Sequence, residues 1–497
     1  MLALFVCEQT GKMIICVFTL MMSAIFPLYA QEEEYYPFYS SDSTKLRELA
    51  VAQQASLKNH FVVPRNMSPD YRESYNTIIK KSAEESYRRV LSSALLDTIV
   101  DPYIQSVYRV IVRANSDLPD TKLILTRSAV ENAYALADGT VFFNIGLLAK
   151  LENESQIAFI ICHELAHIKL SHMERSIKES LDAFYSKEFK KQYRQTAKVE
   201  YNRHAKMGAL LQGLSLGNLQ HRRSFEKQAD SLGFVFLSRT KYSTAEAYTA
   251  LQALDKIDAP YSSQKLDLGA LFSCSDFSYS FEEGQAKESS IFDVRETMVA
   301  FPDNPDTLRT HPDCLKRMGY IRELERAFPV EANRQTYQTS ALESIKLLCR
   351  REVVQSLYET QNYDYALFNA LLLLREQPES GYLKSMVMLC LYELKRHLLL
   401  HRFAEVVSVE SEHHPENFQH LLRVLYNLNT SDFEGIGNCF AQKMRIEEGT
   451  HEYQLAAQYA FAVLREDTEV AEQIKKTYLD RHKEGRFRET LFSASLK

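Results

Sequence analysis

The segment His163-Glu164-Leu165-Ala166-His167 constrains this chain more than any other part of its sequence. In an α-helix, two histidines four residues apart project from the same face, so both imidazoles can bind one metal ion. A glutamate directly after the first histidine can reach a water molecule on that metal. The pattern therefore predicts one Zn²⁺ per chain, with His163 and His167 as ligands and Glu164 as the general base. The alternative interpretation is a surface helix with two solvated histidines.

The residues around this motif favour a long helix with one apolar side. Asn153 can cap its N-terminus, and Gln156 stands three residues later as a capping-box partner. Neither glycine nor proline occurs between residues 152 and 190, so we expect helix throughout this stretch. Apolar residues with helical spacing form a core side next to the side that carries the histidines: Ile157, Ile161, Leu165 and Ile168.

A catalytic zinc ion usually has three protein ligands and an open position for water. The third ligand is predicted in the segment Glu226-Lys227-Gln228-Ala229-Asp230, where Glu226 and Asp230 share one helical face. Glu226 can bind the metal. Asp230 can accept a hydrogen bond from the free N–H of His163 and fix the orientation of that ring. The small Gly233 would let this helix approach the first one closely, although an acidic surface pair is the alternative.

A different zinc site, with a third histidine six residues after His167, is excluded because Met173 occupies that position. His172 follows His167 by five residues. On an ideal helix it would point about 140° away from His167. We therefore expect His172 beside the site or on the surface, and not on the metal.

Three short runs with strand character precede the metal helix, and helices are expected over about residues 70–115 and 145–151. The dipeptide Asp138-Gly139 predicts a hairpin turn between the second and third runs. Strands followed by helices in this order indicate an α+β fold that is mainly helical. The third run is a candidate edge for binding an extended peptide, and packing in a sheet core is equally compatible with it. The runs are Lys122–Thr126, Ala133–Leu136 and Thr140–Asn144.

Several motifs follow one another along the chain: Asn132–Leu136 with Gly139, Gly146–Leu148, His163–His167, Glu226 with Asp230, and Thr310-His311-Pro312 with Arg317. In this order they resemble metallopeptidase family forty-eight, which includes HtpX-, BepA- and Oma-type zinc endopeptidases. The resemblance implies a gluzincin-type zinc metallopeptidase domain with a small sheet, placed here at residues 70–330. The exported, repeat-tailed build is most similar to BepA-type proteases.

His311 has two candidate roles near the metal. Pro312 favours an extended loop at His311, from which the imidazole could stabilise the oxyanion of the reaction. The resemblance to BepA-type proteases implies instead that this histidine occupies the open metal position and keeps the enzyme inactive. A surface loop histidine is the third interpretation.

The first thirty residues have the pattern of a secretion signal. Lys12 precedes the apolar run Met13–Phe26, and we predict cleavage after Ala30. The apolar run has roughly 14 residues, too few to span a bilayer, although a retained N-terminal anchor is the alternative. Residues 31–69 are predicted to be an exposed leader. Export permits disulfides, and the pairs considered are Cys274–Cys314 and Cys349–Cys390.

With 497 residues, the chain has room for two or three domains. From residue 331 to residue 497 the pattern is helical, and three segments recur at about the repeat length of tetratricopeptide arrays. We predict an all-α, tetratricopeptide-like interaction domain, with a bundle without repeats as the alternative. The three segments are Tyr363–Leu394, Phe403–Leu428 and Phe433–Leu464.

A net charge of −6 and the absence of a basic block argue against nucleic-acid binding. No stretch after the signal is apolar enough to cross a membrane. The sequence predicts an exported zinc-dependent metalloendopeptidase, periplasmic or secreted, with peripheral attachment at the outer membrane as an option. By resemblance, its substrates are misfolded or stalled envelope proteins, and its helical domain contacts outer-membrane assembly machinery. The alternative is a chaperone-like binding protein with a restrained protease site.

Overall fold

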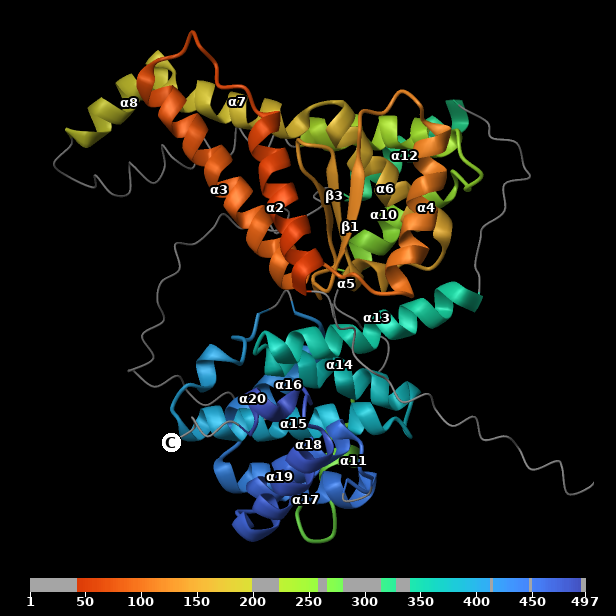
Figure 1. The fold of residues 1–497 in the computed structure, drawn as a ribbon, viewed down its shortest axis with the longest axis vertical. Helices are drawn as coiled ribbons and strands as arrows, with labels where there is room; N and C mark the ends of the chain where they lie inside the picture. The colour runs from red at the N-terminus through yellow and green to blue at the C-terminus, as the bar shows by residue number, and fades with distance from the viewer. Residues whose placement is uncertain are drawn as a thin grey trace, which may run out of the picture.

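The computed structural model describes residues 43–198, 223–257, 266–279, 314–327, 340–411, 414–446 and 449–492. Two parts are visible in Figure 1: an upper part that contains the sheet and a lower part made of helices. The helix α13 (Ser340–Glu359) lies between them. The predicted fold class, a mainly helical α+β part followed by an all-helical part, is confirmed.

Within the described residues before the sheet, the chain forms α2 (Ser43–His60), α3 (Pro69–Ser93) and α4 (Val100–Ala114). The prediction of an exposed leader over residues 31–69 is wrong for α2, which packs along α3. Residues at helical spacing on α2 are buried there, because they form a stripe that α3 covers. That stripe consists of Leu46, Ala50, Gln53 and Leu57. The predicted signal and the cleavage after Ala30 lie outside the described residues.

The sheet has three strands, β1 (Lys122–Thr126), β2 (Ala133–Ala135) and β3 (Thr140–Asn144), in the order β1-β3-β2. β3 runs parallel to β1 and antiparallel to β2, so the predicted hairpin is confirmed. Gly139 in its turn has φ +88°, and a Cβ there would lie 2.3 Å from a backbone oxygen. Only glycine fits this position.

The candidate peptide-binding edge at residues 140–144 is contradicted by the strand order. β3 pairs with a strand on each side, so its backbone groups are already used within the sheet. Among the described strands, β2 lies at the edge next to the metal helix.

The metal helix is α6 (Glu154–Lys169), which follows the single turn α5 (Ile145–Leu148). The side chain of Asn153 caps α6 by accepting from the backbone N–H of Gln156. The predicted continuous helix is interrupted, because Ser171 adopts a left-handed conformation with φ 53°. The chain then continues as α7 (His172–Tyr185) and α8 (Lys187–Ala197).

The upper part also contains, among the residues that the structure describes, the helix of residues 223–238, α10 (Glu246–Ile257) and α12 (Cys314–Ala327). α6 packs against α4, α10 and β2, so the motif lies in the middle of this part. In the described parts of the chain, no helix combines the length and apolar character needed to cross a bilayer.

The helical part only partly follows the predicted repeat. The first and third predicted units are helix pairs, but the middle unit contains one α-helix and a short 3-10 turn. Three valines after Glu405 disfavour helix there, because β-branched side chains lose rotamer freedom in a helix. The elements are α14 (Tyr363–Glu376), α15 (Gly381–Leu399), η2 (Phe403–Glu405), α16 (Glu416–Asn427), α17 (Thr430–Met444), α18 (Glu452–Leu464), α19 (Thr468–Arg481) and α20 (Phe487–Thr490).

A segment from the middle of the chain, residues 266–279, packs into the helical part. Its short helix α11 (Leu268–Phe272) contacts α17, and Cys274 forms a disulfide with Cys439 of α17. Both predicted cysteine pairs are wrong, because folding brings this segment to α17 and leaves the other partners apart. Cys314, Cys349 and Cys390 are buried and take part in no disulfide among the described residues.

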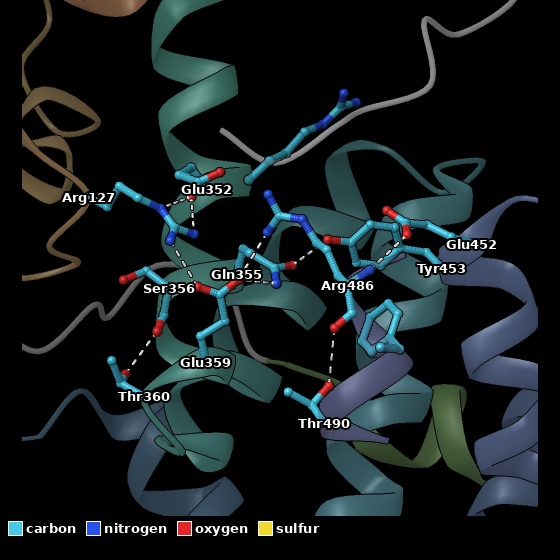
Figure 2. A network of polar contacts seen from close by, with 12 residues as sticks. Arg127, Glu352, Gln355, Ser356, Glu359, Thr360, Glu452, Tyr453, Arg486 and Thr490 are labelled. Carbon is cyan, nitrogen blue, oxygen red and sulfur yellow. Dashed lines mark hydrogen bonds and ion pairs between the residues drawn. The ribbon is translucent and has the colours of Figure 1, made fainter. Parts of the chain in front are cut away.

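Polar contacts also join the two parts. Arg127, which follows β1, donates to Glu352 at 2.6 Å and to Glu359 at 2.9 Å, and both glutamates belong to α13. Arg486 from the end of the chain donates to Glu359 at 3.0 Å. Figure 2 shows these side chains pointing toward one another where the upper part meets the helices. The predicted boundary at residue 330 remains a prediction.

Candidate metal centre

The structure brings together three predicted ligands from two helices. α6 supplies His163 and His167, whose Nε2 atoms lie 3.0 Å apart. The helix of residues 223–238 supplies Glu226, whose carboxylate oxygens lie 3.5 Å from each of these nitrogens. One donor atom from each residue falls within 4.8 Å of the others.

Gly233 allows the two helices to come this close. A Cβ at this position would lie 3.0 Å from the backbone Cα and N of His163. Those atoms belong to the middle of α6 and cannot move away as a flexible side chain could. The predicted close approach at Gly233 is therefore confirmed, and it sets how far Glu226 can reach toward the histidines.

Asp230 lies behind His163, on the side away from the cluster. Its Oδ1 is 2.9 Å from His163 Nδ1, so the Nε2 atom of that ring faces the other donors. Burial lowers the pKa of His163, but hydrogen bonds with Asp230 and Glu226 outweigh this effect and raise it to about 10. The contact holds the ring in the orientation that a metal ligand needs.

Arg317 on α12 holds both carboxylates of the site. It donates from Nε and Nη2 to Asp230 at 2.8 and 2.7 Å, and its Nη1 lies 2.9 Å from Glu226. Burial would raise the pKa of both carboxyls, but the Arg317 charge holds both below their usual range. In the sequence, Arg317 belongs to a motif that predicts no role for it. The structure shows that Arg317 is a positioning residue, because it holds Asp230 and Glu226 in place.

The donor set fits a zinc ion. Two imidazole nitrogens and one carboxylate oxygen are ligands that zinc takes in catalytic sites. Each carboxylate oxygen has two lone pairs, so Glu226 can bind a cation while its Oε2 atom keeps the ion pair with Arg317 Nη1 at 2.9 Å. Burial and the neighbouring His163 charge lower the pKa of His167 to about 3, which leaves this ring neutral. A neutral imidazole is the form that binds metals, so a metal ion would have to displace the proton that Asp230 and Glu226 favour on His163.

His172 lies much nearer to the site than the ideal-helix geometry predicted. Because α6 ends at Lys169, the ring of His172 turns back, and its Nδ1 is 2.9 Å from Nδ1 of His167. It stacks on Phe225 at 4.4 Å, and its Nε2 is 3.4 Å from the side-chain oxygen of Gln228. Nothing in the sequence marked Phe225 or Gln228, because their contacts depend on the break in the helix.

Glu164 is buried between the cluster and the edge of the sheet, with 4% of its surface exposed. Burial raises the pKa of its carboxyl to about 7, although the nearby His163 charge and the backbone N–H of Ala135 lower it. A carboxyl with a pKa near neutrality can both accept and return a proton at physiological pH. The predicted site residue His311 lies outside the described residues, and its roles stay predictions.

The sheet packed on α6, the two histidines and the carboxylate from a second helix define a metallopeptidase type of domain. Residues 99–325 match Peptidase family M48 and therefore form a domain of this family. A relative in Vibrio cholerae is 26% identical over 169 residues, which are 32% of this chain and 34% of the relative. The beta-barrel assembly-enhancing protease of Escherichia coli K12 is 27% identical over 173 residues, which are 34% of this chain and 35% of that protein. The chain thus aligns with about a third of each relative's length.

Proposed function

We propose that this protein is an exported zinc-dependent metalloendopeptidase. The observation that carries the proposal is the convergence of His163, His167 and Glu226 within 4.8 Å, with Glu164 buried beside them. These three residues would hold one Zn²⁺. When bound, zinc polarises a water molecule and the substrate carbonyl.

Glu164 is proposed to move the proton. With a pKa raised to about 7 by burial, it can accept a proton from the attacking water and deliver it to the leaving amine. The backbone N–H of Ala135 bonds to this carboxylate and orients it. Asp230 and Arg317 keep His163 and Glu226 in place without contacting the substrate.

β2 is proposed to bind the substrate backbone, in place of β3. The backbone N–H of Leu136 donates to the carbonyl of Thr140, and the carbonyl of Asn132 accepts from the backbone N–H of Asn144. The even-numbered residues in and beside β2 therefore form the backbone hydrogen bonds to β3. In an antiparallel pair, the alternating residues point the other way. Ala133 and Ala135 therefore direct backbone groups away from β3. The Ala135 N–H bonds to Glu164, and an extended peptide would add as a strand through the other groups of this edge.

The proposed substrates are polypeptides that are misfolded or stalled in the cell envelope. This proposal is supported by the name of the E. coli relative, a beta-barrel assembly-enhancing protease. The helical part would contact outer-membrane assembly machinery, and the protein would be periplasmic or secreted. A chaperone-like binding protein with a restrained site is the second candidate, favoured by the motif around His311.

Glu164→Gln tests the proposed function. We expect the variant to bind zinc and to cleave casein at less than a hundredth of the wild-type rate, because general base catalysis contributes about 10²–10⁴-fold. Glu152→Gln, at an exposed glutamate just before α6, is the matched control and should cleave normally. Normal cleavage by Glu164→Gln, or wild-type protein that binds no zinc, would contradict the proposal.

His311→Ala separates the two roles of that histidine. A rise in casein cleavage is expected if the side chain occupies the open metal position. A fall would support oxyanion stabilisation, and an unchanged rate would remove His311 from the mechanism.

A further inference from the structure

The helix α8 presents a row of cationic side chains on one face. Their spacing of three or four residues places all of them on the same side of the helix. The opposite side holds α8 to the protein, because Phe189 is buried there and packs against Phe184 at a ring distance of 5.3 Å. The row therefore faces away from the core. It consists of Lys187, Lys190, Lys191, Arg194 and Lys198, all exposed, and is called the α8 basic face.

The α8 basic face is not neutralised by the protein. Within the described parts of the chain, none of its members forms an ion pair, whereas basic residues of α3, α7, α13 and α19 do. Lys190 instead lies over the ring of Tyr185 at 4.8 Å. The chain as a whole has a net charge of −6, so this face locally reverses the overall charge. Neighbouring like charges destabilise a helix, and an external polyanion would relieve that repulsion.

Two partly exposed aromatic side chains lie near α8, and both pack on Phe189. Tyr193 is 47% exposed on α8, and Phe184 is 42% exposed at the end of α7. Cations on one face with aromatic rings at its border are typical of helices that lie in the headgroup region of a bilayer. An acidic protein would need the cations but would leave the exposed parts of these rings unexplained. The net charge of −6 on the whole chain argues against a nucleic acid.

The position of α8 at one end of the upper part would let it contact an extended, flat surface. It lies beyond α7 at one end of the upper part, away from the sheet (Figure 1). Tyr185 fixes this end by hydrogen bonds to Ser74 at 2.7 Å and to the backbone of Asp70 at 3.0 Å. From these observations we propose that the α8 basic face binds the surface of an anionic lipid bilayer. This inference does not depend on the proposed peptidase activity.

Vesicle co-sedimentation of the full-length protein tests the inference. Each cation near an anionic membrane strengthens binding about fivefold. The variant with Lys187, Lys190, Lys191 and Arg194 all changed to glutamine should therefore bind mixed phosphatidylglycerol and phosphatidylcholine vesicles at least a hundredfold more weakly. Wild-type protein should bind these vesicles less at high salt and should not bind pure phosphatidylcholine.

A matched control removes the same charge elsewhere. Lys476, Arg481, Lys483 and Arg488 are exposed on the helical part, and changing all four to glutamine should leave vesicle binding intact. Tyr193→Ser should weaken binding severalfold while the charges remain. Equal losses for the two fourfold variants would show a net-charge effect and overturn the inference. It would also be overturned by binding to polyglutamate or nucleic acid without binding to anionic vesicles.

Discussion

Arg317→Met removes a buried cation from between two buried carboxylates. The Arg317 side chain is 3% exposed, and it lies 2.7 Å from Asp230 and 2.9 Å from Glu226. Methionine is flexible and fills much of the same space without charge. The variant would therefore keep the packing of α12 but leave Asp230 and Glu226 without the partner that lowers their pKa.

Removing one partner of a buried ion pair costs about 3–5 kcal/mol, because the other charge stays buried and uncompensated. Arg317 pairs with two carboxylates, so the loss of stability should lie toward the upper end of this range. The hydrogen bond between His163 and Asp230 remains in the variant and offsets part of the loss. We expect the free energy of unfolding of the zinc-free variant to fall by about 4 kcal/mol at neutral pH.

The pH dependence of this loss has a defined sign. The folded-state pKa of Asp230 is lowered, so its ionised form contributes stability above its unfolded pKa. That contribution is lost as the pH falls through the range where carboxyls gain protons. The difference in the free energy of unfolding between wild type and Arg317→Met should therefore become smaller below a pH of about 4.

Urea unfolding in the presence of a chelator measures the loss, because bound zinc would stabilise the folded state by itself. Arg239→Met is the control: Arg239 pairs with Asp117 at 2.7 Å, but its side chain is 41% exposed. An exposed pair contributes at most about 1 kcal/mol. Similar losses for the two variants, or a difference that widens in acid, would refute the role given to Arg317.

Three further predictions address the ligands and the base. His172→Phe keeps a ring at this position but removes the acceptor beside His167, so zinc affinity by chelator competition should fall about 10–100-fold with an unchanged zinc-free melting temperature. Gly233→Ala should cost about 1–3 kcal/mol in urea unfolding, because the added Cβ meets the backbone of His163. The kcat/KM for a peptide should fall as the pH drops below the Glu164 pKa of about 7, because protonation removes the base. The charge of bound zinc lowers the Glu164 pKa, so a midpoint of the kcat/KM profile well above pH 7 would contradict the third prediction. Unchanged zinc affinity of His172→Phe would contradict the first, and unchanged stability of Gly233→Ala would contradict the second.

Local patterns in the sequence were sufficient to locate most of the site. The positions of His163 and His167 on one helical face follow from a spacing of four residues, and the same holds for Glu226 and Asp230. The hairpin followed from Asp138-Gly139, whose glycine adopts the positive φ that the turn requires. Each of these features depends on residues close together in the chain.

The features that escaped prediction depend on distant contacts or on a single backbone angle. β3 lies in the middle of the sheet only because β1 pairs with it in parallel across an intervening hairpin strand. Ser171 follows α6 in a left-handed conformation, and no glycine stands next to it in the sequence to indicate such a turn. This turn brings His172 to the site. The disulfide joins cysteines 165 residues apart, so spacing along the chain could not identify it.

The way α13 is packed bears on how the helical part could serve the proposed peptidase. Leu342 and Ile345, near its start, belong to the hydrophobic core that surrounds α6, whereas Val354 belongs to the core of the helical part. A flexible linker would only raise the local concentration of a polypeptide held on the helices. One helix shared by two cores, together with the Arg127 contacts to that helix, instead limits the orientations available. A polypeptide bound by the helical part would then approach the β2 edge from a restricted set of directions, which favours some cleavage positions over others.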